Sequence, residues 1–193
     1  MAWIFAVNCR ATSGYVTDTS PETYSLANTD SAYPVSRGGF TFGYTSVYGD
    51  AERNRNNAID RRFAGIHQCA NSTQSVFRVD LPATGLYTVR LAMGDYNNDQ
   101  LHWFEVFDNV TSKFSTSNVL STATNFLDAN GTSRSVAAWP GSNTPKTGVS
   151  FASTTFILKY GGNGVGVGNS ALAHLYIEQE VTAVSMLSCL GAG

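Results

Sequence analysis

Apolar and polar positions alternate most regularly between Ser75 and Asp95. Two runs with apolar residues at every second position are separated by Pro82 and Gly85. A period of two is typical of a β-strand with one buried face and one face in water. Pro82 lacks the N–H that a strand ladder needs, and Gly85 supplies the backbone freedom of a turn. The stretch therefore predicts an antiparallel hairpin, which we place at the centre of a sheet.

Shorter runs of the same kind recur along the rest of the chain. Strands are expected at residues 2–8, 40–44, 101–107, 110–114, 119–126, 133–139, 154–160 and 171–179, and residues 63–69 are ambiguous. Turn signals separate these runs, and no stretch has the period of an amphipathic helix. The pattern predicts an all-β protein with almost no helix. We expect one antiparallel β-sandwich or jelly roll of roughly nine to eleven strands, formed by residues 1–193 as a single domain.

Composition narrows the class of protein. Charged residues make up 13% of the chain, and the net charge is −2, against a usual charged share of about 25%. A chain of this kind has no basic field to attract nucleic acid. No apolar run is long enough to cross a bilayer, and residues 1–10 lack the basic segment of a signal peptide. We therefore expect neither a nucleic acid nor a membrane as partner.

The three cysteines are Cys9, Cys69 and Cys189. An odd number at wide spacing is not a disulfide framework, and no Cys/His cluster predicts a zinc site. Three buried thiols are the expectation. One long-range bridge with a leftover thiol is the alternative.

Three segments carry a resemblance to a known superfamily. They read GGFTFGY at residues 38–44, DAERNRNNAIDRRFAGIH at 50–67 and FRVDLPATGLYTVRLAMGD at 77–95. This part of the chain resembles the galactose-binding-like β-sandwich. That superfamily includes the jelly-roll carbohydrate-binding modules attached to rhamnogalacturonan-degrading esterases and the malectin-like domains. The resemblance implies a jelly-roll fold and a non-catalytic module that binds a glycan, although a fold alone does not define a function.

The sequence offers no recognisable catalytic centre, so we expect a protein that is not an enzyme. The related esterases place a serine nucleophile after Gly-Asp, but here Gly94-Asp95 is followed by Tyr96. The histidines have no Ser or Cys motif nearby and are interpreted as packed or surface residues. They are His67, His102 and His174. An acid–base pair of Asp80 and Glu105 is the alternative, and it is one that any β-sandwich offers.

No organic cofactor is expected, but a structural calcium ion is a candidate. Asp95, Asn97 and Asp99 place oxygen ligands at alternate positions, as at the start of a calcium loop. Gln100 stands where an EF-hand has glycine, so the calcium hypothesis rests on family analogy. A second oxygen-rich run contains Asp50, Glu52, Asn54 and Asn56. The alternative is that these side chains cap loop turns.

Glycan binding requires exposed aromatic rings beside planar polar groups. Candidates in the expected loops are Tyr44, Tyr48, Arg53, Arg55, Tyr96 and Trp139. The alternative is that most of the aromatic rings fill the core of the sandwich.

Two functional hypotheses follow. The first is a decoration or accessory protein of a virus particle such as a phage capsid. It is motivated by the apolar residues at both ends, 2–7 and 181–190, which should bury themselves against a sheet or a neighbouring subunit. It predicts a homo-oligomer, with a trimer favoured, located in the virion. The second hypothesis is a free-standing carbohydrate-binding module that recognises a plant or microbial glycan outside the cell.

Overall fold

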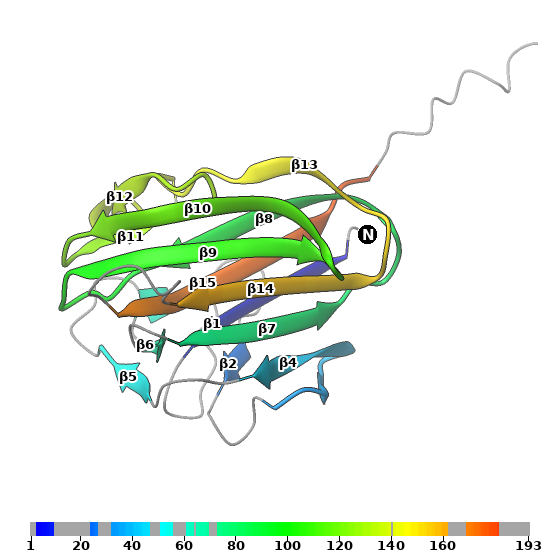
Figure 1. The fold of residues 1–193 in the computed structure, drawn as a ribbon, viewed down its shortest axis with the longest axis horizontal. Coiled ribbons are helices and arrows are strands. Elements are labelled where there is room, and N and C mark those ends of the chain that lie inside the picture. Colours follow the sequence, from blue (N-terminus) through cyan, green and yellow to red (C-terminus); the bar gives the residue numbers. More distant parts are fainter. Residues whose placement is uncertain are drawn as a thin grey trace, which may run out of the picture.

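The computed structural model describes residues 3–9, 24–26, 32–46, 51–55, 61–63, 65–69, 73–139, 141–161 and 169–181. In this part of the chain the fold is all-β, as predicted, and its strands form two sheets that lie face to face (Figure 1). The helical residues among those described form two single-turn 3-10 helices, Arg61–Phe63 and Val136–Ala138. None of the described helices is long and apolar enough to span a bilayer.

The larger sheet has nine strands among the described residues. They are β1 (Ile4–Cys9), β2 (Tyr24–Leu26), β5 (Ala51–Asn54), β6 (Gly65–Cys69), β8 (Gly85–Met93), β11 (Asn125–Leu127), β12 (Ser133–Ser135), β13 (Lys146–Phe151) and β15 (Ser170–Gln179). Strands β8 and β15 pair over seven registered residue pairs and form its centre. Strand β1 lies beside β15 and pairs on its other side with β2.

The smaller sheet has six strands in the order β10-β9-β14-β7-β4-β3. They are β3 (Val35–Arg37), β4 (Phe40–Ser46), β7 (Gln74–Asp80), β9 (Gln100–Asp108), β10 (Thr111–Ser121) and β14 (Thr155–Gly161). All neighbours in this sheet are antiparallel.

The predicted central hairpin is wrong in its pairing, although both of its strands exist. Strand β7 pairs with β14 and β4 in the smaller sheet, whereas β8 pairs with β15, β13 and β11 in the larger one. The turn at residues 81–84 therefore carries the chain from one sheet to the other. Both strands have an apolar face, and the sandwich buries these faces against each other instead of placing them side by side.

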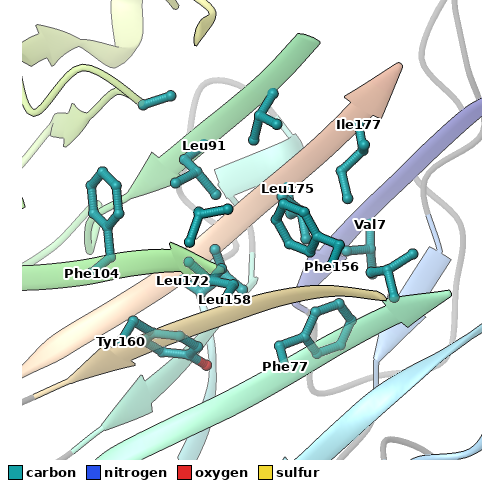
Figure 2. Close-up of a cluster of buried hydrophobic side chains, with 14 of the residues drawn as sticks. Val7, Phe77, Leu91, Phe104, Phe156, Leu158, Tyr160, Leu172, Leu175 and Ile177 are labelled. Atoms are coloured by element: carbon teal, nitrogen blue, oxygen red, sulfur yellow. The ribbon is translucent and has the colours of Figure 1, made fainter. Parts of the chain in front are cut away.

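The core fills the space between the two sheets. Along β7, Phe77 and Val79 are buried, whereas Arg78 between them is only partly buried. Along β8, Tyr87, Val89 and Leu91 are buried, and the residues that alternate with them between positions 87 and 91 are only partly buried. Figure 2 shows side chains from both sheets meeting in one apolar cluster. Full burial of one such side chain contributes roughly 1.5–3 kcal/mol to folding, so this shared layer is the main source of stability.

Two other strand predictions need correction. The runs at 110–114 and 119–126 were expected as separate strands, but β10 continues from Thr111 to Ser121 and absorbs two register shifts against β9. The run at 133–139 forms only the short β12 before a 3-10 turn begins at Val136. Ser135 caps that turn by accepting a hydrogen bond from the Ala137 N–H, a local bond that competes with strand pairing.

Two of the histidines lie inside the sandwich. The ring of His102 hydrogen-bonds through Nε2 to Ser121 Oγ at 2.7 Å and through Nδ1 to Ser170 Oγ at 3.2 Å. The ring of His67 hydrogen-bonds through Nδ1 to Tyr160 Oη at 2.6 Å. Burial lowers the pKa of His67 to about 4 and that of His102 to about 3. Both residues are therefore neutral packing elements near pH 7, in agreement with their interpretation as packed histidines.

The cysteine prediction holds for the thiols that the structure describes. Cys9 and Cys69 are buried and reduced. The Cys9 thiol contacts Tyr44 Oη, and the Cys69 thiol donates a hydrogen bond to Ser75 Oγ. Cys189 lies outside the described residues.

The buried histidines predict a protein that loses stability in mild acid. In the unfolded chain a histidine binds a proton below about pH 6.5, whereas the folded protein protonates His67 only near pH 4 and His102 only near pH 3. The free energy of unfolding should therefore be greatest above pH 6.5. As the pH falls from there toward 4, it should decrease by about 1.4 kcal/mol per pH unit for each histidine.

Urea unfolding at a series of pH values measures this slope. A His102→Gln variant removes one of the two contributions, so its slope between pH 6 and pH 4 should be roughly half that of the parent chain. Equal slopes in the two proteins would contradict the assignment of His102.

Candidate functional site

The outward face of the smaller sheet carries an unusual set of side chains. Along β9 the residues alternate strictly: His102, Phe104 and Val106 point into the core and are buried. The intervening residues point outward and are only partly buried. Together with their neighbours on β14 and β7 they form what we name the aromatic face. It consists of Trp103, Glu105, Phe107, Ile157, Lys159, Arg78 and Asp80.

Strand register sets the order of these side chains across the sheet. In one row Ile157 of β14 stands between Phe107 of β9 and Arg78 of β7. In the next row Lys159 pairs with Glu105. Residues of one strand that are two positions apart share a face, so both rows project from the same side of the sheet.

Trp103 is the most available ring of the aromatic face. Its indole N–H and ring have no hydrogen bond, ion pair or ring contact with any described residue. The Glu105 carboxylate, on the same face of β9, likewise has no hydrogen-bond or ion-pair partner among the described residues. Gly161 is the residue next to the Tyr160–Phe104 pair, so β14 has no side chain beside Trp103. An available ring, one donor and one acceptor therefore lie together.

The other polar groups of the aromatic face are held in place by neighbours. The Lys159 ammonium lies 4.3 Å from the centre of the Phe107 ring. The Arg78 guanidinium lies 4.5 Å from the centre of the Tyr33 ring and forms a 2.8 Å ion pair with Asp80. Tyr33 donates a hydrogen bond to the same Asp80 carboxylate at 3.0 Å. Cation–π contacts of this kind stabilise by about 0.5–1 kcal/mol at exposed sites and restrict the cation.

The electrostatic character of the aromatic face is balanced. Lys159 and Arg78 are positive, and Glu105 and Asp80 are negative. Partial burial and the hydrogen bond to Asp80 raise the pKa of Tyr33, so its phenol remains a protonated donor at neutral pH. The face therefore presents apolar rings and fixed dipoles without a net charge.

The proposed acid–base carboxylates do not meet across this surface. Asp80 pairs with Thr155 and Glu105 pairs with Lys159, four positions further along β14. Four residues of a strand span about 13 Å, which exceeds the roughly 5–9.5 Å that separates the two carboxyl groups of a glycosidase. Asp80 is moreover engaged by Arg78 and Tyr33.

The glycan-binding residues proposed from the sequence are distributed over different parts of the structure. Tyr44 is 3% exposed and hydrogen-bonds through its hydroxyl to Tyr160 at 2.7 Å, so it belongs to the core and has no exposed ring. Tyr48 lies outside the described residues. Arg53 is exposed on β5. Ligand binding by Arg53 stays a prediction.

Two of the remaining candidates pack against a second, smaller apolar cluster. Tyr96 and Trp139 are partly buried against it, and it is built from Phe63, Ile66, Ala92, Phe126, Val136, Ala171 and Ala173. The Trp139 ring meets Phe63 and Phe126 edge-on at 5.0 and 5.1 Å, and the Arg62 guanidinium lies 4.9 Å from its centre. These contacts explain the placement of both rings by packing. A role for them in glycan binding stays a prediction.

Arg55 and Asp95, which were assigned to a sugar site and a calcium site, bind each other. Two guanidinium nitrogens of Arg55 lie 2.5 Å from the two carboxylate oxygens of Asp95. The Asn97 N–H and the Asn98 side-chain amide donate to the same carboxylate at 2.9 Å. Burial alone would raise the pKa of Asp95, but these hydrogen bonds outweigh it and hold the pKa below the usual value.

This geometry bears on the calcium hypothesis. The Asp95 carboxylate already accepts hydrogen bonds from a cation and two amides, and a calcium ion would have to displace them. Asn97 and Asp99 are exposed, and one Asp99 oxygen accepts a hydrogen bond from the Ala123 N–H. The described residues hold no group of three or more His, Cys, Asp or Glu side chains suited to a metal. The hydrogen bonds of Asp95 and Asp99 to backbone N–H groups are those of a capped turn, which is the alternative interpretation of residues 95–99.

Sequence reasoning missed the aromatic face because it looked for ligand-binding rings in loops. The signal was present in LHWFEVF at residues 101–107. A strand that alternates Trp, Glu and Phe on one side with His, Phe and Val on the other has two faces rich in large side chains. Only one of these can be the core of a two-layer sandwich, so the other must face outward.

The sequence matches no protein-family model and no curated protein. The fold does match solved structures. The plant receptor-like kinase FER superimposes with a TM-score of 0.52 at 11% identity over 92% of this chain and 42% of that chain. The CBM36-1 domain of a multidomain xylanase from the hindgut metagenome of Trinervitermes trinervoides gives 0.39 at 11% identity, over 74% of this chain and 98% of that one. TmCBM61 in complex with β-1,4-galactotriose gives 0.34 at 12% identity, over 74% and 90%.

The resemblance expected from the sequence is confirmed for the fold. The β-sandwich architecture of this chain is shared with the matched part of the receptor-like kinase structure. It spans less than half of the receptor kinase structure. At this identity the likeness concerns architecture, and function has to be argued from the residues of this chain.

The Arg55–Asp95 pair predicts a large loss of stability when one partner is removed. The Asp95 side chain is 1% exposed and that of Arg55 is 13% exposed. Replacing Asp95 with Ala removes the carboxylate that lies against a largely buried guanidinium, so the free energy of unfolding should fall by about 3–5 kcal/mol. Urea or thermal unfolding measures this loss.

The matched control is Glu105→Ala, which removes a carboxylate that has no partner among the described residues. Its effect on stability should stay within about 0.5 kcal/mol. The double variant Arg55→Ala, Asp95→Ala should lose less than the sum of the two single variants, because the two side chains interact directly. Additive losses would show that the pair is not coupled.

Proposed function

We propose that this chain is a non-catalytic glycan-binding module whose ligand lies against the aromatic face. The observation that carries the proposal is the group formed by Trp103 and Glu105. A partly exposed indole with a free N–H lies on the same strand face as a carboxylate that has no partner among the described residues. The Trp103 ring can stack on the apolar C–H face of a sugar, and the indole N–H and the Glu105 carboxylate can hydrogen-bond to its hydroxyl groups.

The physical argument concerns what a rigid surface can bind. Trp103 follows His102 and precedes Phe104 on β9, and Phe104 pairs with Thr116 of β10 and Tyr160 of β14. The backbone on either side of Trp103 is therefore held within the sheet, and less conformational entropy is lost on binding than for a ring on a loop. An aromatic ring supplies a large apolar contact area, and its indole N–H adds a directional bond. Lys159, held at the Phe107 ring, adds a charged donor to the same face.

A non-catalytic role agrees with the geometry of the described residues. His67 and His102 are enclosed in the core and bonded to tyrosine or serine hydroxyls. The carboxylates Asp80 and Glu105 are too far apart along the sheet to act as an acid–base pair. The groups of the aromatic face are thus suited to contact a ligand rather than to transform it.

The alternative role in a virus particle receives no support from the described residues. The N-terminal apolar run forms β1, which is paired within the domain to β15 and β2. It therefore meets its need for burial without a neighbouring subunit. The C-terminal residues 182–193 lie outside the described part of the chain. A homo-trimer, a virion location and an extracellular location all stay predictions, and light scattering of the purified chain over a range of concentrations tests the first.

The proposal predicts that Trp103 is required for glycan binding. The full chain should retain at least one class of plant or microbial glycan on an array, and Trp103→Ala should weaken that binding at least about tenfold, or about 1.4 kcal/mol. Trp103→Phe should recover part of the affinity because it restores a ring.

Leu86→Ala is the matched control. Leu86 is 42% exposed on β8 of the other sheet, so its truncation should leave glycan binding unchanged. Thermal unfolding of each variant shows whether the fold is intact. Full binding by a folded Trp103→Ala variant would remove the aromatic face as the site.

A further inference from the structure

The aromatic face has two separate places for a ligand along one strand. Trp103 and Phe107 lie on the same side of β9, four residues apart. A strand rises about 3.3–3.4 Å per residue, so the two ring positions are separated by about 13 Å. A single sugar ring is shorter than this distance. A monosaccharide can therefore contact one of the two places, whereas a chain of several sugars can contact both.

The groups between these two places favour a ligand that follows the strand. Glu105 projects between Trp103 and Phe107, and Lys159 stands opposite it in register. The Lys159 ammonium reaches the Phe107 ring at 4.3 Å. Moving along β9 from Trp103, a ligand thus meets the Glu105 carboxylate as acceptor, the Lys159 ammonium as donor and then the apolar ring of Phe107.

A ligand that crossed the strands would meet groups that are already engaged. In the row from Phe107 to β7, the Arg78 guanidinium is bound to Asp80 at 2.8 Å and covers the Tyr33 ring at 4.5 Å. A sugar that used the Arg78 guanidinium would have to displace an ion pair and a cation–π contact, whereas one that used the Lys159 ammonium would displace a single cation–π contact. The groups without such contacts, Trp103 and Glu105, both belong to β9.

The charge of the face selects among glycans. The positive charges of Arg78 and Lys159 are matched by the negative charges of Asp80 and Glu105. Glu105, which has no ion-pair partner among the described residues, would repel the carboxylates of an acidic polysaccharide placed along β9. A neutral chain meets no such repulsion.

We propose that the ligand of the aromatic face is a neutral, extended oligosaccharide that lies along β9, with one sugar against Trp103 and another at the Phe107–Lys159 pair. This inference rests on the proposed function and adds the class and the direction of the ligand. It requires affinity to rise with chain length until both places are filled and to stay constant beyond that length. It also requires that neutral chains bind more tightly than acidic chains of equal length.

Calorimetric titration of the full chain tests this. The probes are neutral β-1,4-linked galactose, glucose and xylose series, from the monosaccharide to the hexasaccharide, and oligogalacturonides of the same lengths. At least one neutral series should bind about tenfold or more tightly as a longer oligosaccharide than as its monosaccharide. The oligogalacturonides should bind more weakly. Raising the salt concentration should narrow the difference, because salt screens the repulsion by Glu105.

Two variants separate the places. Phe107→Ala should abolish the increase in affinity with chain length, and Trp103→Ala should weaken all lengths. The matched control is Tyr176→Ala, which removes a partly buried ring from β15 on the outer side of the other sheet. Its length dependence should equal that of the parent chain. Glu105→Gln should raise the affinity for the oligogalacturonides.

The outcomes distinguish this inference from the proposed function. Binding that depends on Trp103 but is equally tight for the monosaccharide and the hexasaccharide would overturn the extended ligand and leave the glycan-binding module intact. Tighter binding of the oligogalacturonides would overturn the neutral class. Absence of binding to every probe and to the glycan array would overturn both proposals.

Discussion

The structure depends on the burial of two apolar strand faces against each other. Each sheet contributes every second residue of its central strands to one shared layer, with Phe77 and Val79 on one side and Val89 and Leu91 on the other. Because side chains alternate across a strand, this burial also decides which residues face outward. The aromatic face is thus a direct consequence of the core: Trp103, Glu105 and Phe107 point to solvent because His102, Phe104 and Val106 point inward.

The same constraint explains the hydrogen bonds made by several buried polar residues. A buried polar group without a partner destabilises the fold, so His102 is bonded to two serine hydroxyls and Asp95 to Arg55 and two amides. The hydrogen bonds of His102 join β9 to β10 and β15, and those of Asp95 join the segment after β8 to Arg55. The unpaired side chains Trp103 and Glu105 lie instead on an outward face, where water can satisfy them in the absence of a ligand. That difference in solvation separates His102 and Asp95 from the candidate binding groups Trp103 and Glu105.

Periodicity in the sequence was enough for the fold class and for most long strands, because β7, β8, β9 and β14 each carry several alternating residues. It could not show that β7 and β8 belong to different sheets. The alternation of a strand reveals that one face is buried, but the partner of that face lies elsewhere in the chain. Short strands such as β11 and β12 carry too few residues for a period to be visible. The ring of Tyr44 was misplaced for a related reason: an aromatic residue near the end of a strand has the same local pattern whether it closes the core or faces a ligand.

The candidate site was predictable in principle from one strand and one rule of architecture. A two-layer sandwich buries one face of each sheet, so a strand with large aromatic side chains on both faces must expose some of them. Residues 101–107 are such a strand. What the sequence could not supply is the neighbourhood of these residues: the lysine at the Phe107 ring comes from β14 and the arginine from β7. The balance of charge on the face is therefore a property of strand order, and it follows only when three segments that are distant in the sequence are placed side by side.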